Sequence, residues 1–284
     1  MKISDNSAVR KLVAWSGGKP LLVDDFGSGK GLICLHGLGG GGYFFSGLSQ
    51  SLQGSNRVLS FDMPGAGFNV HVVEHFSIEA CVQATVEIID QVSPEPVVLL
   101  GHSMGVIIAL KAYARRKDAV SGLIFLGGLP EPVSAIKDKL GQRVEKLKKV
   151  GMSGIGEEVM PGIFAEETFS RRRHLVGMYQ RLLEMNSKDS YVESIQALIQ
   201  ADANEEVENI SVPCLAITGM EDLYASPLDF KKFVSSITSE VTLEVFENCG
   251  HMIFYEDPDR LHESVYTFLQ SLDSDWAFTY GENP

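Results

Sequence analysis

The chain has 284 residues, of which 44% are hydrophobic and 21% charged, enough for one large α/β domain with an insertion or for two small domains. Its formal net charge of −13 disfavours nucleic acid and anionic membranes as partners. The opening, Met1 to Asn6, is polar without a hydrophobic signal segment, and no apolar run is long enough to span a bilayer, so we expect a cytoplasmic protein.

The first elements expected along the chain are two strands at 10–15 and 20–26, which a Ser-Gly-Gly-Lys turn joins into a β-hairpin. Beyond the hairpin, short apolar runs alternate with helical patterns. Further strands are expected at 31–35, 57–61, 97–100, 122–126, 214–218 and 241–246, and helices at 43–52, 77–92, 104–115, 227–236 and 258–272. Continuous apolar runs are typical of strands buried on both faces of a parallel sheet. The alternation therefore predicts an α/β fold with an open, mostly parallel twisted sheet flanked by helices.

Residues 131–202 interrupt this alternation, because they contain helical patterns and no strand-like run. Helices are expected at 133–150, 154–160, 169–185 and 190–199. In the first of them Leu140, Val144 and Leu147 recur at i, i+4 and i+7, the spacing of one face of an amphipathic helix. An insertion between strands lies most naturally over the carboxyl ends of the sheet, where ligands bind. We expect 131–202 to form a helical cap inserted after the sixth strand, on a core made of 1–130 and 203–284; a surface decoration away from any site is the alternative.

A nucleophile elbow is indicated where the strand at 97–100 gives way to the helix that begins at Met104. The residues Gly-His-Ser-Met-Gly at 101–105 have the G-x-S-x-G pattern, in which a sharp turn exposes the serine hydroxyl above the sheet. Strand and helix approach each other closely in such a turn, so a Cβ at Gly101 or Gly105 would clash. Ser103 is therefore the expected nucleophile; a tight turn with a surface serine is the alternative.

A serine nucleophile needs a general base and an acid that orients the base. His251 lies in the loop after the last expected strand, and Asp222 lies in the loop after the strand before it. The chain order of serine, acid and histidine is that of the α/β-hydrolase sheet. We expect Ser103, Asp222 and His251 to form a catalytic triad, with Glu221 and Glu131 as rivals for the acid.

Acyl transfer also needs backbone donors aimed at the oxyanion. The N–H of Met104 opens the helix after the elbow, and the N–H of Leu38 lies in the glycine-rich loop at 36–42. This loop lacks the Gly-Lys-Ser/Thr ending and the G-x-G-x-x-G spacing of nucleotide-binding loops. We expect Leu38 and Met104 to form the oxyanion hole. The residues expected to border the substrate pocket are His36, Gly37, Gly39, Tyr43 and His102.

The cysteines do not indicate a metal site. Cys34, Cys81, Cys214 and Cys249 are dispersed and lack zinc-like spacing. Cys249 is close to His251, but a packed loop residue is a more economical interpretation than a reactive thiol. The expected chemistry uses neither a metal nor another cofactor.

Together these residues resemble the α/β-hydrolase superfamily, in its serine-hydrolase branch, over about residues 10 to 270. The resemblance is carried by the loop that begins His-Gly at 36, the segment Asp-Met-Pro-Gly-Ala-Gly at 62–67, the elbow, Asp222 and His251. It implies an α/β-hydrolase fold with a helical cap where 131–202 lies. Within the superfamily the chain is most similar to 3-oxoadipate enol-lactonase-like hydrolases and small esterases, through Pro-Gly-Ile-Phe at 161–164 and Ile-Ser-Val-Pro at 210–213.

The leading hypothesis is hydrolysis of a small-molecule carboxylic ester or lactone through an acyl-enzyme. Arg171, Arg172 and Arg173 could bind a carboxylate of such a substrate; a solvated helix face is the alternative. Two other functions use the same fold and triad. One is a small-molecule receptor or signalling protein with slow or no turnover, and the other is a perhydrolase or haloperoxidase-like activity without a cofactor.

Overall fold

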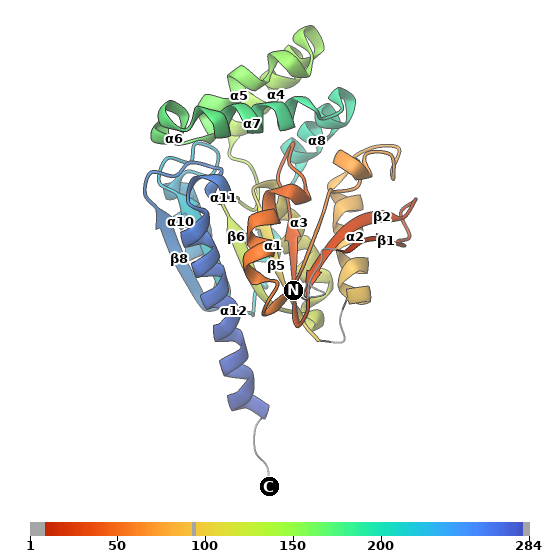
Figure 1. Ribbon diagram of the computed structural model, residues 1–284, viewed down its shortest axis with the longest axis vertical. Helices are drawn as coiled ribbons and strands as arrows, with labels where there is room; N and C mark the ends of the chain where they lie inside the picture. Colours follow the sequence, from red (N-terminus) through yellow and green to blue (C-terminus); the bar gives the residue numbers. More distant parts are fainter. Residues whose placement is uncertain (1–8, 93–94, 281–284) are drawn as a thin grey trace, which may run out of the picture.

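The computed structural model of the protein describes residues 9–92 and 95–280, with side chains described as far as 272. An eight-stranded sheet runs through it in the order β1-β2-β4-β3-β5-β6-β7-β8 (Figure 1). β1 pairs antiparallel with β2 and β2 with β4, whereas the later pairings are parallel. The strands are β1 (Val9–Val13), β2 (Leu21–Gly27), β3 (Lys30–Leu35), β4 (Asn56–Phe61), β5 (Val97–His102), β6 (Val120–Leu126), β7 (Cys214–Gly219) and β8 (Val241–Phe246). The mostly parallel sheet expected from the sequence is confirmed.

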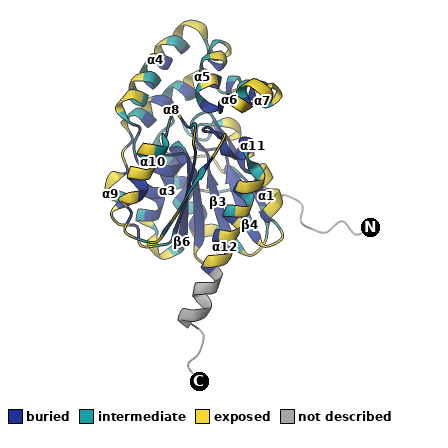
Figure 2. Ribbon diagram, turned by 90° about the vertical axis from the view of Figure 1, so that its left-hand side faces the viewer, coloured by how far each residue is buried: buried dark blue, intermediate teal, exposed yellow. Residues whose placement is uncertain are grey.

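From β3 onward, helices fill the connections between strands and cover both faces of the sheet. Figure 2 places α1 and α12 on one side of it and α3 on the other. The helices outside the stretch between β6 and β7 are α1 (Ser46–Leu52), α2 (Ile78–Val92), α3 (Met104–Arg115), α10 (Pro227–Ser235), α11 (Ile253–Glu256) and α12 (Pro258–Tyr280). The expected helix at 43–52 is a 3-10 turn, Gly42–Phe45, followed by α1.

The middle of the sheet is apolar because its central strands are buried on both faces. Every residue of β5 and of β7 is buried. The parallel register places Leu99 of β5 between Ile33 of β3 and Leu123 of β6. The edge strand β1 is by contrast mostly exposed. Figure 2 shows the dark blue sheet between helices with yellow outer faces. This dry, close-packed sheet is a rigid base for the loops that follow its strands.

Five helices between β6 and β7, called the cap helices below, lie above the carboxyl ends of the strands (Figure 1). They are α4 (Ser134–Val150), α5 (Gly156–Ile163), α6 (Glu166–Arg171), α7 (Arg173–Glu184) and α8 (Lys188–Gln200), and a short α9 (Asn204–Val207) leads on to β7. The helical insertion after the sixth strand is therefore present. The exact division of the chain at 131 and 202 stays a prediction.

The helix expected at 169–185 is two helices in the structure. The break falls at Arg172, whose backbone (φ −112°, ψ 43°) leaves the helical region. The Arg172 guanidinium donates hydrogen bonds to the carbonyl oxygens of Tyr255 (2.9 Å) and Glu256 (2.8 Å). These partners in the α11 region are remote in sequence, so the local helical pattern did not contain the break.

The expected cytoplasmic location is based on two features, the lack of a run long enough to span a bilayer and the polar opening of the chain. Among the described residues, no helix is both long and apolar enough to cross a membrane. The polar opening, Met1 to Asn6, lies outside the described residues. A cytoplasmic location stays a prediction.

Candidate active site

The turn between β5 and α3 holds Ser103 in an uncommon backbone conformation. Its φ of 55° and ψ of −119° lie where non-glycine residues are rarely found. The Ser103 N–H donates to the carbonyl of Leu126 (3.0 Å), and the Ser103 carbonyl accepts from the N–H of Val106 (2.9 Å). Strain of this kind persists only where the surrounding structure fixes it, and it clusters at functional sites.

Close approaches of backbone require both glycines of this turn. A Cβ on Gly101 would lie 2.4 Å from the carbonyl oxygen of Gly105. A Cβ on Gly105 would lie 2.1 Å from the carbonyl oxygen of Leu35. The clash expected at both positions is confirmed. At Gly105, however, the nearest backbone belongs to the neighbouring strand β3, so the start of α3 is pressed against two strands.

His251 and Asp222 meet from the loops after β8 and β7. The Nδ1 of His251 donates to Oδ2 of Asp222 over 2.8 Å. The other carboxylate oxygen, Oδ1, accepts from the backbone N–H groups of Tyr224 (2.7 Å) and Ala225 (2.9 Å). Asp222 is 1% exposed and His251 is 6% exposed, so the pair is shielded from water. This arrangement holds the imidazole with Nδ1 protonated and leaves Nε2 as its basic nitrogen.

The two rival carboxylates have other partners. Glu221 is adjacent to Asp222 in sequence but accepts a hydrogen bond from the first backbone N–H of α6 (2.9 Å). Glu131 pairs with Lys137 at 2.9 Å. Of the three candidates, Asp222 is the carboxylate that lies against His251.

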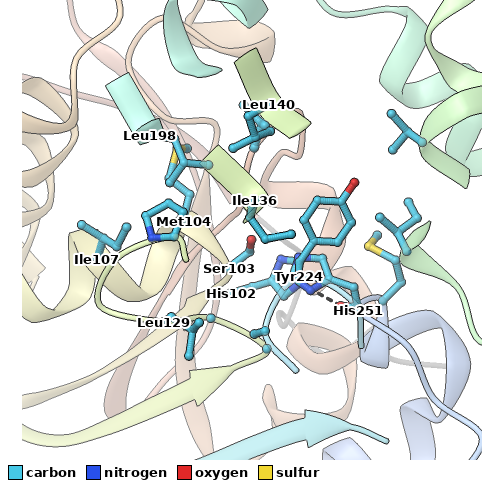
Figure 3. A pocket seen from close by; sticks show the side chains of 18 of the residues that line it. His102, Ser103, Met104, Ile107, Leu129, Ile136, Leu140, Leu198, Tyr224 and His251 are labelled. Atoms are coloured by element: carbon cyan, nitrogen blue, oxygen red, sulfur yellow. Dashed lines mark hydrogen bonds between the residues drawn. The ribbon is translucent and has the colours of Figure 1, made fainter. Parts of the chain in front are cut away.

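A cavity lies between the serine elbow and the cap helices (Figure 3). Ser103 and His251 line the same cavity, and Figure 3 shows them beside Tyr224. Most of the remaining wall is apolar and comes from both halves of the molecule. Its members include Ile107 and Leu129 below and Ile136, Leu140 and Leu198 above. A reaction in this cavity would take place in a partly dry environment.

The backbone donors expected for an oxyanion hole border the cavity. Met104 is the first residue of α3, so its N–H has no acceptor within the helix. Leu38 lines the cavity from the loop after β3. His36 anchors that loop, because its Nδ1 donates to the carbonyl of Gly37 (2.8 Å) and its Nε2 accepts from the N–H of Met63 (2.8 Å). Burial lowers the pKa of His36, which keeps Nε2 unprotonated and able to accept.

Of the five residues expected to border the substrate pocket, one lines the cavity and four do not. His102 lines it, and the others, His36, Gly37, Gly39 and Tyr43, are not among the lining residues. Side chains of the cap form this part of the cavity wall in place of the loop residues. A Cβ on Gly39 would lie 2.6 Å from Leu183 and 2.8 Å from Tyr191, and both of these side chains line the cavity. No local pattern in the sequence indicates that α7 and α8 cover this end of the loop.

His102 connects the elbow to the loop that carries His251. Its Nε2 donates to the carbonyl of His251 (3.0 Å), so its Nδ1 carries the lone pair. That Nδ1 is buried and has no partner in the described part of the chain. Burial lowers the pKa of His102 well below its ordinary value, and the ring is therefore neutral.

The cap also contributes polar groups that were not expected from the sequence. Arg143, Tyr191 and Tyr179 of the cap helices line the cavity, as does Tyr224 of the loop after β7. The ring of Tyr224 lies 5.2 Å from the ring of His251. Arg143 stands three residues after Leu140 and directly before Val144, beside the apolar stripe expected on this helix. A charged residue beside that stripe was the signal that could have revealed it.

The loop that carries His251 is fastened to the cap as well as to the sheet. The His251 N–H donates to the carbonyl of Ile163, at the end of α5, over 2.8 Å. The buried carboxylate of Glu256 accepts from the N–H of Gly250 (2.9 Å) and from the N–H of Ala165 (2.8 Å). Burial raises the pKa of Glu256. These bonds couple the position of the histidine to that of the cap.

Neither the arginine run nor any cysteine lines the cavity. Arg171 pairs with Glu167 (3.3 Å) on the exposed side of α6, and Arg173 is exposed. The four cysteines are free and buried. Burial raises the pKa of Cys249 to about 12, which makes its thiol a poor nucleophile. Over residues 9–92 and 95–272, no three metal-ligating side chains gather into a site.

The strained serine elbow on this sheet defines an α/β hydrolase, and comparison with known proteins agrees. Residues 32–264 match the alpha/beta hydrolase family, so the chain belongs to that family, as its sequence resemblance implied. One curated relative is (E)-2-((N-methylformamido)methylene)succinate hydrolase from Acinetobacter baylyi. It is 25% identical over 247 residues, which cover 86% of this chain and 92% of that protein.

Two solved structures show the same fold. An esterase from Thermogutta terrifontis superimposes with a TM-score of 0.83 at 19% identity, covering 94% of this chain and 99% of the other. The enol-lactonase from Burkholderia xenovorans LB400 superimposes with a TM-score of 0.81 at 21% identity, covering 92% of this chain and 100% of the other. At these identities the likeness concerns the fold, and the chemistry has to be argued from the site.

Proposed function

We propose that the protein is a serine hydrolase that cleaves a small carboxylic ester or lactone through an acyl-enzyme intermediate. The observation that carries this proposal is that His251, which Asp222 orients through a hydrogen bond of 2.8 Å, lines the same cavity as the strained Ser103. The names of the relatives support it, because they include a hydrolase of a succinate derivative, an esterase and an enol-lactonase.

In the acylation step, the Nε2 of His251 takes the proton of the Ser103 hydroxyl as its oxygen attacks the substrate carbonyl. Asp222 keeps the imidazole in the tautomer with Nδ1 protonated and stabilises the imidazolium that forms. The N–H groups of Leu38 and Met104 donate to the tetrahedral oxyanion, a contribution of roughly 3 kcal/mol for each donor. The protonated His251 then gives its proton to the leaving alcohol, and an acyl ester on Ser103 remains.

In the deacylation step, the same residues act on water. His251 takes a proton from a water molecule that attacks the acyl carbonyl, and the oxyanion again lies against the two backbone donors. Collapse of this intermediate releases the carboxylic acid and returns the proton to Ser103. For a lactone the leaving alcohol stays attached to the acyl group, so a single hydroxy acid leaves the site.

The test is hydrolysis of a panel of short p-nitrophenyl esters and lactones by the wild-type protein and by Ser103→Ala. We expect turnover of at least one member of the panel, and a loss of about 10⁴-fold or more in kcat in the variant. Circular dichroism spectra and Tm serve as controls for folding. Ester turnover that is unchanged in Ser103→Ala would rule the proposal out. Absence of turnover across the panel would favour the receptor alternative.

A further inference from the structure

Arg143 is a buried cation in the cavity that contains Ser103. It belongs to the cap helix α4, lines the cavity, and is only 2% exposed. Its Nη2 donates to the hydroxyl of Tyr224 (2.6 Å), and its Nη1 makes a longer contact with the hydroxyl of Tyr191 (3.4 Å). Its Nε–H is buried and has no partner in the described part of the chain. The guanidinium therefore has donors to spare.

No carboxylate among the described residues pairs with this guanidinium. Glu131, which also lines the cavity, pairs with Lys137, and Glu158 of the cap pairs with Lys146. The two groups that contact Arg143 are neutral hydroxyls. An arginine stays protonated in a protein, and an unpaired charge in a buried position costs free energy. An anion that enters the cavity from outside would supply the missing partner.

The position of Arg143 relative to the reacting groups follows from Tyr224. The ring of Tyr224 lies 5.2 Å from that of His251, and its hydroxyl accepts the short hydrogen bond from Arg143. Figure 3 shows this hydroxyl at the end of the ring that points away from His251. The guanidinium thus lies about one tyrosine side chain from the catalytic histidine, at the cap end of the cavity. A ligand held at both ends needs an ester near Ser103 and an anion near Arg143.

We propose that Arg143 is a specificity-determining residue that binds a carboxylate of the substrate, so that the protein acts on esters or lactones carrying a second, ionised carboxyl group. This inference rests on the proposed hydrolase function. The guanidinium has a planar set of donors that matches the two oxygens of a carboxylate. Because the hydroxyls of Tyr224 and Tyr191 accept from Arg143, their own O–H groups are free to donate to the same anion.

Other cations do not compete for this role. Arg171 and Arg173 are exposed, and Arg172 is held by backbone carbonyls of the α11 region. Lys139 lies over the ring of Tyr224 at 4.8 Å but does not line the cavity. Its charge adds to the positive potential at the cap end. The carboxylate-binding role that the sequence suggested for 171–173 is thus reassigned to Arg143.

The test measures binding without turnover, so its failure can be distinguished from a failure of the hydrolase proposal. In the Ser103→Ala background, Kd is measured by calorimetry for the monomethyl esters of succinic, glutaric and adipic acid. Each is compared with the corresponding methyl ester amide, called the half-amide below. In this compound a neutral carboxamide of the same shape replaces the carboxylate, and the methyl ester is kept. For at least one chain length we expect the half-ester to bind about tenfold or more tightly than the half-amide.

Variants at position 143 then identify the residue responsible. Arg143→Met in the same background should weaken half-ester binding by about 10- to 100-fold and change half-amide binding by less than about threefold. Arg143→Lys keeps the charge without the planar donor set, so its affinity for the half-ester should lie between those of the parent and of Arg143→Met. Arg171→Gln, which removes an exposed arginine from the cap, is the matched control and should bind like its parent. Equal binding of half-ester and half-amide at all three lengths, or discrimination that survives in Arg143→Met, would overturn the proposal.

Thermal stability separates this role from a structural one. If Arg143 awaits a ligand, its unpaired charge destabilises the ligand-free protein, so Arg143→Met should raise the Tm without ligand. A lower Tm in Arg143→Met together with unchanged discrimination between half-ester and half-amide would make Arg143 a structural residue and contradict the inference.

Discussion

The two ends of the cavity differ in how their polar groups are paired. At the sheet end, the Asp222 carboxylate accepts hydrogen bonds from the His251 ring and from two backbone N–H groups, so its oxygens are satisfied within the protein. At the cap end, the Arg143 guanidinium contacts two neutral hydroxyls and keeps a buried, unpaired Nε–H. Asp222 is 1% exposed and Arg143 is 2% exposed, so these two charged groups differ in how fully they are paired and not in burial.

This difference separates two tasks of the site. Groups that carry out the same chemistry on every substrate have to be held in place before the substrate arrives, and their partners are therefore part of the chain. A group that selects the substrate can leave its strongest partner to be supplied by the ligand. On this account the sheet end determines the reaction, and the cap end determines which ester or lactone undergoes it.

The largest expected effect is at the sheet end of the cavity, where Asp222 is fully paired within the protein. Asp222→Asn keeps the shape of the acid but removes the charge that orients His251 and stabilises its imidazolium. We expect kcat for a reactive ester to fall by about 10³- to 10⁴-fold with little change in KM. Glu221→Gln, one position away, is the control and should stay within about twofold. Comparable losses in the two variants would mean that Asp222 is not the orienting acid.

The next effect compares one substitution in the two regions. Gly105→Ala puts a Cβ 2.1 Å from the carbonyl oxygen of Leu35 and should lower the free energy of unfolding by about 3 kcal/mol. Gly141→Ala, on the cap helix α4, meets nothing within 4 Å and should raise it by up to about 1 kcal/mol, because alanine favours a helix. Urea denaturation measures both values. A Gly105→Ala protein as stable as wild type would show that the elbow is not held as tightly as described.

The junction between the two regions gives a smaller effect. Glu256→Gln weakens the bonds that its carboxylate accepts from the N–H groups of Gly250 and Ala165. The free energy of unfolding should fall by about 2 kcal/mol, the scale of hydrogen bonds to a charged group. Hydrogen exchange should become faster in the loop around His251 and at the start of α6 together. Faster exchange on one side alone would argue against the coupling of histidine and cap.

The smallest effect is a dependence of stability on pH. Burial lowers the pKa values of His36 and His102, so the unfolded chain takes up protons below about pH 6.5 that the folded protein does not. Stability is therefore fully present above this pH and falls as the pH decreases, by about 1.4 kcal/mol per pH unit for each histidine. His102→Gln should reduce the slope between pH 6.5 and 5.5 by about that amount, as measured by urea denaturation at the two pH values. An unchanged slope would contradict the neutral state assigned to His102.

The sheet end could be predicted from the sequence because its signals are local. The continuous apolar run before Gly101 and the two glycines around Ser103 specify a strand, a sharp turn and a helix within a few residues. Asp222 and His251 each follow a strand directly, and parallel strands bring such loops to one edge of the sheet. The positions of these side chains depend on register and chain order, which the pattern contains.

The cap end could not be predicted in the same way, because its geometry depends on contacts between remote segments. The break at Arg172 depends on carbonyls of Tyr255 and Glu256, and the wall near Gly39 depends on Leu183 and Tyr191. The helical character of the cap can be recognised by its periodicity, but its division into five helices and their angles over the sheet are set by packing that no local pattern encodes. Arg143 was visible as a charge beside an apolar stripe; its place in the cavity was not.

The role of Ser103 can be tested by mass spectrometry after treatment with a fluorophosphonate, which reacts with activated serines. We predict one adduct on the wild-type protein, mapped by peptide analysis to Ser103, and none on Ser103→Ala. Asp222→Asn should react far more slowly, because its histidine is no longer held as a base. An adduct at another serine, or equal labelling of wild type and Ser103→Ala, would contradict the assignment of Ser103 as the nucleophile.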